Sequence, residues 1–187
     1  MKITIRQATR DDARFIAGVV AMAIGHDGSK DYVGDDVINA LTEVALRDDS
    51  QYSYRNALIA EADGKIAGAI VGYDGADLES LREASLSVIR KYHPDIVVTD
   101  DETGPDEFYI DSLGVLPEYR GKGIARRLID ALIDRASEKG HRRFGLLVDF
   151  ENHSAEALYR SIGFTQVGIT PFFGHPMKHL QLINSVN

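Results

Sequence analysis

A glycine-rich segment at residues 115–125, VLPEYRGKGIA, contains the residues of the chain best suited to bind an anion. Its pattern indicates the end of a strand, a turn with Gly121 and Gly123, and the start of a helix. Glycine lets the backbone approach a ligand closely because no Cβ intervenes. The first N–H groups of a helix have no partner within it, and the helix dipole favours negative charge there. The segment therefore predicts a pyrophosphate-sized anion site, to which Arg120 and Lys122 add positive charge.

Three kinds of nucleotide loop, besides an ordinary glycine-rich turn, could account for this segment. A dinucleotide fingerprint, G-x-G-x-x-G, fails because Arg126 stands at its third glycine. A P-loop fails because Lys122 is followed by Gly123 and the required upstream glycine is missing. A pyrophosphate loop for an acyl-coenzyme A, of the form Q/R-x-x-G-x-G/A, is matched by Arg120, Gly123 and Ala125.

A second motif begins at Asn152, and residues 152–164 read NHSAEALYRSIGF. Together with the glycine-rich turn, this stretch resembles the GNAT-type N-acetyltransferase superfamily, whose pattern N-x-x-A-x-x-L-Y-x-x-x-G-F it follows in full. The resemblance covers roughly residues 106–168, about a third of the chain. The opening segment, residues 5–12, resembles the first strand and helix cap of the family more weakly.

The resemblance implies a fold of the α/β class, the GNAT-like acyl-CoA N-acyltransferase fold. Its central mixed sheet is mostly antiparallel and splays between the fourth and fifth strands, here residues 108–115 and 144–148. Acetyl-CoA is the implied co-substrate, and no metal is implied. The sequence also excludes thiolate metal sites and disulfides, because the chain has no cysteine.

The resemblance also assigns the cofactor contacts residue by residue. The pantetheine arm would pair with the backbone around Leu113 and Val115, as an extra strand would. The N–H groups from Gly121 through Lys122, Gly123, Ile124 and Ala125 to Arg126 would hold the pyrophosphate beside Arg120. Asn152 would contact the pantetheine or cap the helix that follows it. Tyr159 would lie near the cofactor sulfur.

The implied reaction is direct acetyl transfer to a primary amine of a small molecule or a peptide. A protonated amine is not a nucleophile, so a base or a water chain must remove its proton. Glu107 is the first choice for that base by its position relative to Val115, and Asp111 is its rival. If the strand is regular, the two carboxylates share a face, because residues four apart on a strand point the same way. Tyr159 would protonate the departing thiolate, although an aromatic residue at this helical spacing could instead pack in the core.

The elements that must position these residues follow from the hydrophobic periodicity. An Asp63-Gly64 pair between two apolar runs is a strong hairpin signal. Period-two or continuous apolar runs predict strands, and stripes at helical spacing predict helices. The expected strands cover residues 3–5, 57–60, 66–71, 108–115, 144–148, 164–169 and 177–183, and the expected helices cover 15–23, 33–45, 78–92, 124–136 and 154–161.

Between the third and fourth expected strands, residues 74–105 insert a helix and an acidic loop where the family needs only a short turn. Insertions beside a substrate cleft commonly contribute to function. We expect this insert, together with the loop at 25–36, to shape the acceptor site and to attract a cationic amine.

Length and composition define the class of protein. The 187 residues, 44% of them apolar, suit a single domain spanning 1–187. The formal net charge of −8 has the wrong sign for a general nucleic-acid binder. Because no apolar run approaches the length of a membrane span and no signal-peptide core is present, we expect a cytoplasmic protein. A homodimer is compatible with the sequence. So is an acyl-CoA-binding sensor of the same fold without efficient catalysis.

Overall fold

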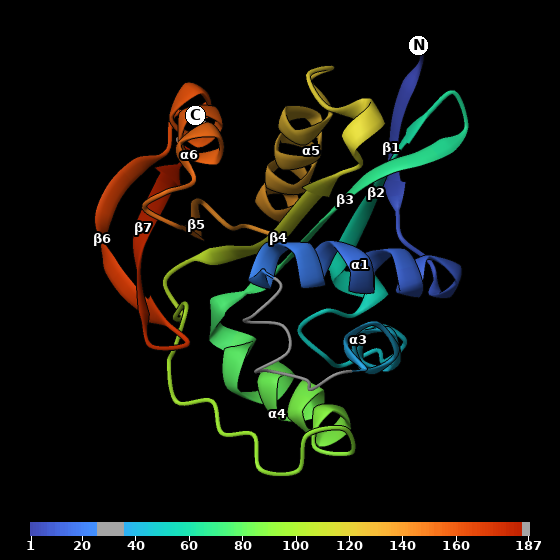
Figure 1. Ribbon diagram of the computed structural model, residues 1–187. Helices are drawn as coiled ribbons and strands as arrows, with labels where there is room; N and C mark the ends of the chain where they lie inside the picture. Colours follow the sequence, from blue (N-terminus) through green and yellow to red (C-terminus); the bar gives the residue numbers. More distant parts are fainter. Residues whose placement is uncertain (26–35, 185–187) are drawn as a thin grey trace.

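The computed structural model describes residues 1–25 and 36–184, which form a seven-stranded mixed sheet flanked by helices (Figure 1). The sheet order is β1-β2-β3-β4-β5-β7-β6. Among the described strands, β4 and β5 pair in parallel, and every other neighbouring pair is antiparallel. The strands are β1 (Ile3–Gln7), β2 (Ala57–Ala62), β3 (Lys65–Asp74), β4 (Phe108–Val115), β5 (Arg143–Val148), β6 (Thr165–Phe172) and β7 (His175–Ile183).

Helices cover both faces of the sheet because alternate strand residues face opposite cores. On β2, Ala57 and Ile59 belong to a core with α1, α3 and α4, whereas Leu58 and Ala60 belong to a core with α5. Helix α6 packs its apolar side chains against the α5 core. The helices are α1 (Ala13–Ile24), α3 (Val37–Ala45), α4 (Leu78–Ile89), α5 (Ile124–Glu138) and α6 (His153–Ile162).

The turn between β2 and β3 confirms the hairpin prediction. Asp63 and Gly64 have φ values of 50° and 78°. Both values are positive, as the type I′ turn that joins two-residue hairpins requires. This hairpin aligns β3 for its long pairing with β4, which carries the residues expected to bind the cofactor.

The splay between β4 and β5 is also confirmed. Their parallel register consists of two pairs, Phe108 with Phe144 and Tyr109 with Gly145, and the strands part beyond Tyr109. On its other edge, β4 pairs with β3 through a register shift that leaves Asp111 unpaired. The condition under which Glu107 and Asp111 were expected to share a face, a regular strand, is therefore not met.

The insert forms helix α4 and a long segment that returns to β4. The helix ends at Ile89, earlier than the apolar stripe through Tyr92 indicates. The next N–H groups bond three residues back instead of four, from Lys91 N to Val88 O and from Tyr92 N to Ile89 O. The segment before β4 passes along the end of the β6–β7 hairpin, where Gly174 N donates to Asp100 Oδ2 at 2.9 Å. Most of the loop at 25–36, and the start of the stripe predicted for 33–45, lie outside the described residues.

Candidate active site

An open cleft of about 500 Å³ lies where β4 and β5 part. Its walls come from the end of α1, from β4, from the turn before α5, from the end of β5, from α6 and from β7. The structure therefore brings together side chains far apart in sequence. Seven of the predicted site residues line this cleft: Asp111, Leu113, Val115, Arg120, Ala125, Asn152 and Tyr159.

The turn before α5 has the backbone geometry of an anion-binding loop. Gly121 and Gly123 have φ values of 72° and 77°, a left-handed conformation that disfavours a side chain, and Gly123 is the N-cap of α5. Ile124 is buried in the core and anchors the first turn of the helix. The first helical bond from the cap runs from Arg127 N to Gly123 O, so the preceding N–H groups, those of Ile124, Ala125 and Arg126, have no partner within the helix.

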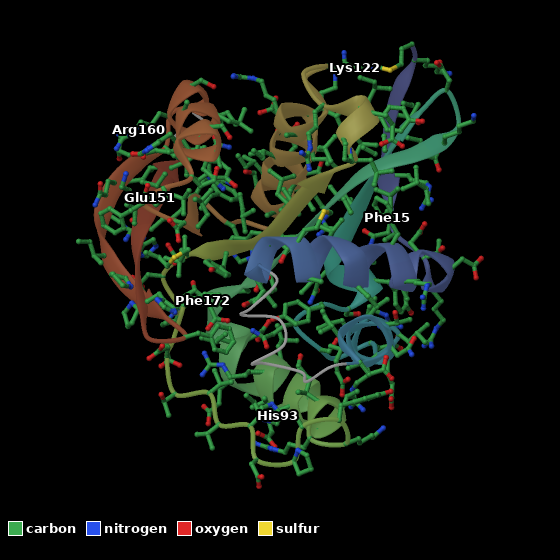
Figure 2. All side chains as sticks on the ribbon, viewed as in Figure 1. Phe15, His93, Lys122, Glu151, Arg160 and Phe172 are labelled. Carbon is green, nitrogen blue, oxygen red and sulfur yellow. The ribbon has the colours of Figure 1, made fainter. Side chains whose placement is uncertain are left out.

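The cationic side chains of this turn are held in different ways. Lys122 Nζ donates to Glu118 O at 2.8 Å and lies over the ring of Tyr119, at the outer edge of the molecule (Figure 2). Arg126 Nη1 contacts Ser161 on α6 at 3.4 Å. Arg120 Nε donates to Val115 O at 3.1 Å, and Arg120 is the one of these three that lines the cleft.

Two predicted residues lie on the α6 side of the cleft. Asn152 Oδ1 accepts from Ala155 N at 3.2 Å, so the capping role expected for Asn152 is present. Tyr159 packs edge-on against Phe164, with a ring separation of 6.0 Å, and its side chain also lines the cleft. Burial raises the pKa of Tyr159 to about 12. Its hydroxyl therefore keeps its proton at neutral pH.

Glu107 precedes β4 and is buried, with a full set of partners. Its Oε2 lies 3.0 Å from His179 Nε2 and accepts from Gln181 Nε2 at 2.7 Å, and its Oε1 accepts from Thr103 Oγ1 at 2.8 Å. Burial alone would raise the pKa of Glu107, but the bonds from His179, Thr103 and Gln181 outweigh it and hold the pKa below its ordinary value. The carboxylate also lies directly against Gly145, where a Cβ would collide with it.

Asp111 has a different environment. Its Oδ2 accepts from the hydroxyl of Tyr73 at 3.1 Å, and its Oδ1 accepts from Ser112 Oγ at 2.7 Å. Burial and then the negative charge of Glu102 raise the pKa of Asp111 to about 7, against the opposing effect of these two hydrogen bonds. A carboxylate with a pKa near the working pH is suited to general base catalysis.

Asp111 also occupies the junction of two cavities. A second, small cavity of about 50 Å³ shares Ala23, Asp111, Leu147 and Met177 with the cleft. Its other walls are mainly apolar and include Tyr109 and Phe172. A group bound in the second cavity would therefore reach the cleft at Asp111. Of the two carboxylates expected as the base, Asp111 lines both cavities, whereas Glu107 lines neither.

Other residues of the site were not found from the sequence. Met22 and Ala23 reach the cleft from α1, and Met177 reaches it from β7. Half of the Met22 side chain is exposed, which is unusual for a large apolar residue, but exposure has no signature in the sequence. Asp149 follows β5 at the edge where the strands part, and its position at the carboxyl end of a strand parallel to β4 is the signal that could have found it.

Two further features concern metal sites and membrane-spanning helices. Within residues 1–25 and 36–184, no group of three or more His, Asp and Glu side chains has the arrangement of a metal site. In the same ranges, no helix is both long and apolar enough to cross a bilayer.

Comparison with known proteins identifies the family. The sequence model of the acetyltransferase (GNAT) family matches residues 29–164, which include the parted strands, the turn before α5 and the second motif. The chain belongs to the GNAT acetyltransferase family. A solved acetyltransferase structure is similar to this GNAT chain over 96% of the chain and 98% of its own length, with 33% identity and a TM-score of 0.79.

Further relatives of this GNAT chain resemble smaller parts of it, or its fold alone. N-alpha-acetyltransferase RimI of Mycobacterium tuberculosis is 43% identical over 70 residues, which are 36% of this chain and 40% of that protein. This chain spans less than half the length of the curated relatives that it matches. An acetyltransferase structure from Salmonella typhimurium, determined with its cofactor acetyl-CoA, has the same fold at 20% identity and a TM-score of 0.63, and the likeness covers 100% of this chain and 96% of that one.

Proposed function

We propose that this GNAT-family chain transfers the acetyl group of acetyl-CoA directly to a primary amine of a small molecule or a peptide. The main support for the proposal is the position of Asp111. This residue lines both the cleft between the parted strands and the smaller cavity that adjoins the cleft. A proton acceptor at this junction can act on an amine that enters from one side and meets a cofactor held on the other.

The residues of the cleft fit acetyl-CoA. Gly121 and Gly123 leave the N–H groups at the start of α5 open to a pyrophosphate, and Arg120 lies beside them. Beyond Tyr109, the edge of β4 that faces β5 no longer pairs with it, so the backbone of Leu113 and Val115 is available to a pantetheine arm. An extended ligand added to a free strand edge is a common mode of recognition.

The chemistry divides among three groups of the chain. Acetyl-CoA supplies an activated thioester. Asp111 takes the proton of the acceptor ammonium, and the free amine then attacks the thioester carbonyl while a backbone N–H of β4 polarises the carbonyl oxygen. As the carbon–sulfur bond breaks, the Tyr159 hydroxyl gives its proton to the departing sulfur, and the proton that the amide nitrogen loses restores the hydroxyl. No covalent enzyme intermediate is needed, which suits a chain without cysteine.

The first experiment is thermal unfolding with and without acetyl-CoA, with NAD and ATP as controls. A ligand at 100 times its Kd adds about 2.7 kcal/mol, which raises Tm by several degrees in a protein of this size. We expect a shift with acetyl-CoA alone, and then thiol release when primary amines are added. A shift without turnover of any amine would favour the acyl-CoA sensor. Equal shifts with NAD or ATP would contradict the cofactor assignment.

A further inference from the structure

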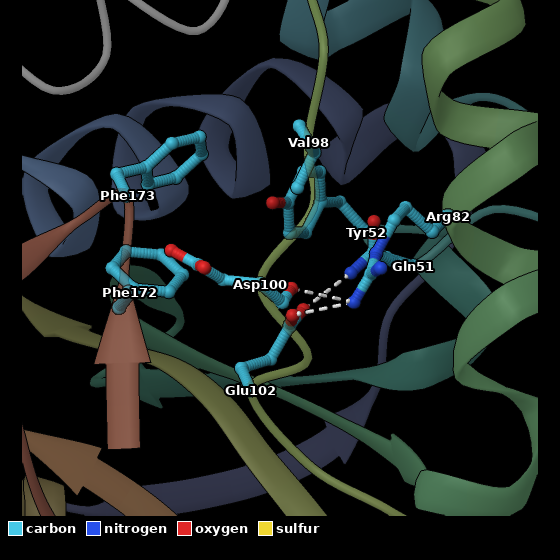
Figure 3. A pocket seen from close by; sticks show the side chains of 8 residues that line it. All are labelled: Gln51, Tyr52, Arg82, Val98, Asp100, Glu102, Phe172 and Phe173. Carbon is cyan, nitrogen blue, oxygen red and sulfur yellow. Dashed lines mark hydrogen bonds and ion pairs between the residues drawn. The ribbon is translucent and has the colours of Figure 1, made fainter.

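A buried polar cluster links the inserted helix α4 to the proposed base. Arg82 of α4 pairs through Nη2 with Glu102 Oε2 at 2.9 Å, and both side chains are nearly buried, at 12% and 6% exposed. Gln51 Nε2 donates to Glu102 Oε1 at 2.8 Å. Figure 3 shows Arg82 and Gln51 converging on Glu102, with Arg82 also donating to the backbone oxygen of Asp100 at 3.0 Å. Phe172 and Phe173 lie on the other side of the small pocket that these residues line.

Tyr73 connects this cluster to Asp111. Its hydroxyl lies 3.2 Å from Glu102 Oε1 and 3.1 Å from Asp111 Oδ2, and it accepts from Gln51 Nε2 at 3.2 Å. Burial, reinforced by the charges of Asp111 and Glu102, raises the pKa of Tyr73 well above its ordinary value. The hydroxyl therefore has one proton that it keeps, and two carboxylates within reach of it.

The Tyr73 hydroxyl can donate its proton to only one of the two carboxylates at a time. The protonation of Asp111 therefore changes the hydrogen bonding of Glu102. When Asp111 is ionised, the hydroxyl can donate to Asp111, and Glu102 retains the bonds from Arg82 and Gln51. When Asp111 is protonated, it can donate to the hydroxyl oxygen, and the hydroxyl can then donate to Glu102. Arg82 and Gln51 bond Glu102 in both cases, so the change in hydrogen bonding falls on the side of Tyr73 that faces Asp111.

Other titratable groups face the same cavities as Asp111. Among the described residues, these are the phenols Tyr109 and Tyr159 and the charged side chains of Arg120 and Asp149, while Tyr73 bonds Asp111 directly. Helix α1 and strands β5, β6 and β7 present apolar side chains to the same cavities, namely Met22, Ala23, Ile24, Leu147, Phe172 and Met177. Of the charged groups, Glu102 is the one whose field acts on Asp111.

We propose that Glu102, fixed by Arg82 of the insert and connected through Tyr73, is a positioning residue that controls proton exchange at Asp111. The proposal rests on the proposed function only in giving Asp111 the role of base. It assigns the insert at 74–105 a part in the reaction itself: its ion pair sets the working pH of the site.

The test compares Glu102→Gln with wild type by two readouts. The first is the titration of the Asp111 carboxyl carbon by NMR, assigned with Asp111→Asn, which needs no turnover. The second is the pH profile of kcat/KM. Loss of a nearby negative charge favours the ionised form of a carboxylate. We expect both midpoints to fall from near pH 7 by about one pH unit, which raises kcat/KM at pH 6 about fivefold.

Three further variants make the test specific. Asp101→Asn removes the charge of Asp101, a partner of Arg82 whose own side chain is 72% exposed. This variant should leave both midpoints in place. Glu102→Asp retains the charge and should keep the midpoint close to wild type. If Glu102→Gln does not fold, Arg82→Gln with Glu102→Gln removes the ion pair as a neutral unit and should still lower the midpoint.

The outcomes separate this inference from the proposed function. An unchanged NMR midpoint in folded Glu102→Gln, or an equal shift in Asp101→Asn, would overturn the inference even if the enzyme turns over. Absence of turnover in wild type, with the NMR shift as expected, would overturn the acetyltransferase proposal and leave the link between Glu102 and Asp111 standing.

Discussion

Tyr159 is the residue whose proposed role depends on a single oxygen atom. Its ring packs on Phe164 and its hydroxyl retains its proton, since burial raises its pKa to about 12. Tyr159→Phe keeps the ring and removes the proton donor. We expect kcat to fall roughly 10²–10⁴-fold with little change in the affinity for acetyl-CoA, measured by thiol release and calorimetry. Tyr92→Phe, a change outside the cleft, is the control, and wild-type turnover in Tyr159→Phe would remove Tyr159 from the mechanism.

The environments of Asp111 and Glu107 predict different effects of substitution, one on turnover and the other on stability. Because Asp111 must be ionised to accept a proton and its pKa is about 7, kcat/KM should fall as the pH falls below 7. Asp111→Asn should lower kcat by roughly 10²–10⁴-fold at constant stability. Glu107→Gln should instead lower the free energy of unfolding by about 1–3 kcal/mol, because it disturbs one buried and two partly buried hydrogen bonds.

The measurement for this pair is the pH profile of each variant beside its urea unfolding curve. A Glu107→Gln variant that folds normally but loses turnover, next to an active Asp111→Asn, would restore the order in which the sequence placed the two carboxylates.

At the scale of elements, the sequence predicted most of what local patterns can determine. The Asp63-Gly64 hairpin, the stripe of α5 and the motif at α6 depend on neighbours within a few residues, and each is present in the structure. Both glycines of the turn before α5 were recognised because their types alone indicate an unusual backbone.

The different environments of the two carboxylates could not be predicted from local patterns. Glu107 is fixed by His179 and Gln181, which follow it by 72 and 74 residues. Asp111 lies where the β3–β4 register shifts, and this irregularity has no signature in the residues of β4 alone. Tyr73 and Glu102, whose side chains are hydrogen-bonded, likewise lie 29 residues apart in the sequence. Contacts of this kind arise from the sheet order and not from periodicity.

The two ends of α5 provide a matched test of the anion-binding turn. Gly123 at the start and Gly140 just past the end both have positive φ, 77° and 99°, and a Cβ added at either position would meet no atom beyond its chain neighbours within 4 Å. Alanine at either position should lower the free energy of unfolding by roughly 1–2 kcal/mol through backbone strain. Only Gly123→Ala should also weaken acetyl-CoA binding, by tenfold or more, in calorimetric titrations. Equal affinity in the two variants would show that the turn does not hold the pyrophosphate.

At the scale of the whole molecule, the question is whether the insert is part of the main core or a separate flap. Leu86, Val88 and Ile89 of α4 are buried in the same cluster as α1, α3, β2 and β3. The insert also supplies Glu102, which is buried against Tyr73 of β3. A helix that shares its core and its buried polar contacts with the sheet should unfold together with the sheet. We therefore propose that residues 1–187 form one cooperative domain.

Ile89→Ala tests this cooperativity. Ile89 has no exposed surface, and truncation of such a side chain costs about 2–5 kcal/mol. If α4 and the sheet unfold as one unit, the whole urea transition should move to lower concentration, and far-UV circular dichroism and tyrosine fluorescence should still give the same midpoint. Val97→Ala, at a position that is 75% exposed in the same insert, should change the free energy by less than about 0.5 kcal/mol. Two separated transitions in Ile89→Ala, or hydrogen exchange accelerated in α4 alone, would show that the insert unfolds independently, and an ion pair carried on such a flap could not hold Glu102 steadily against Tyr73.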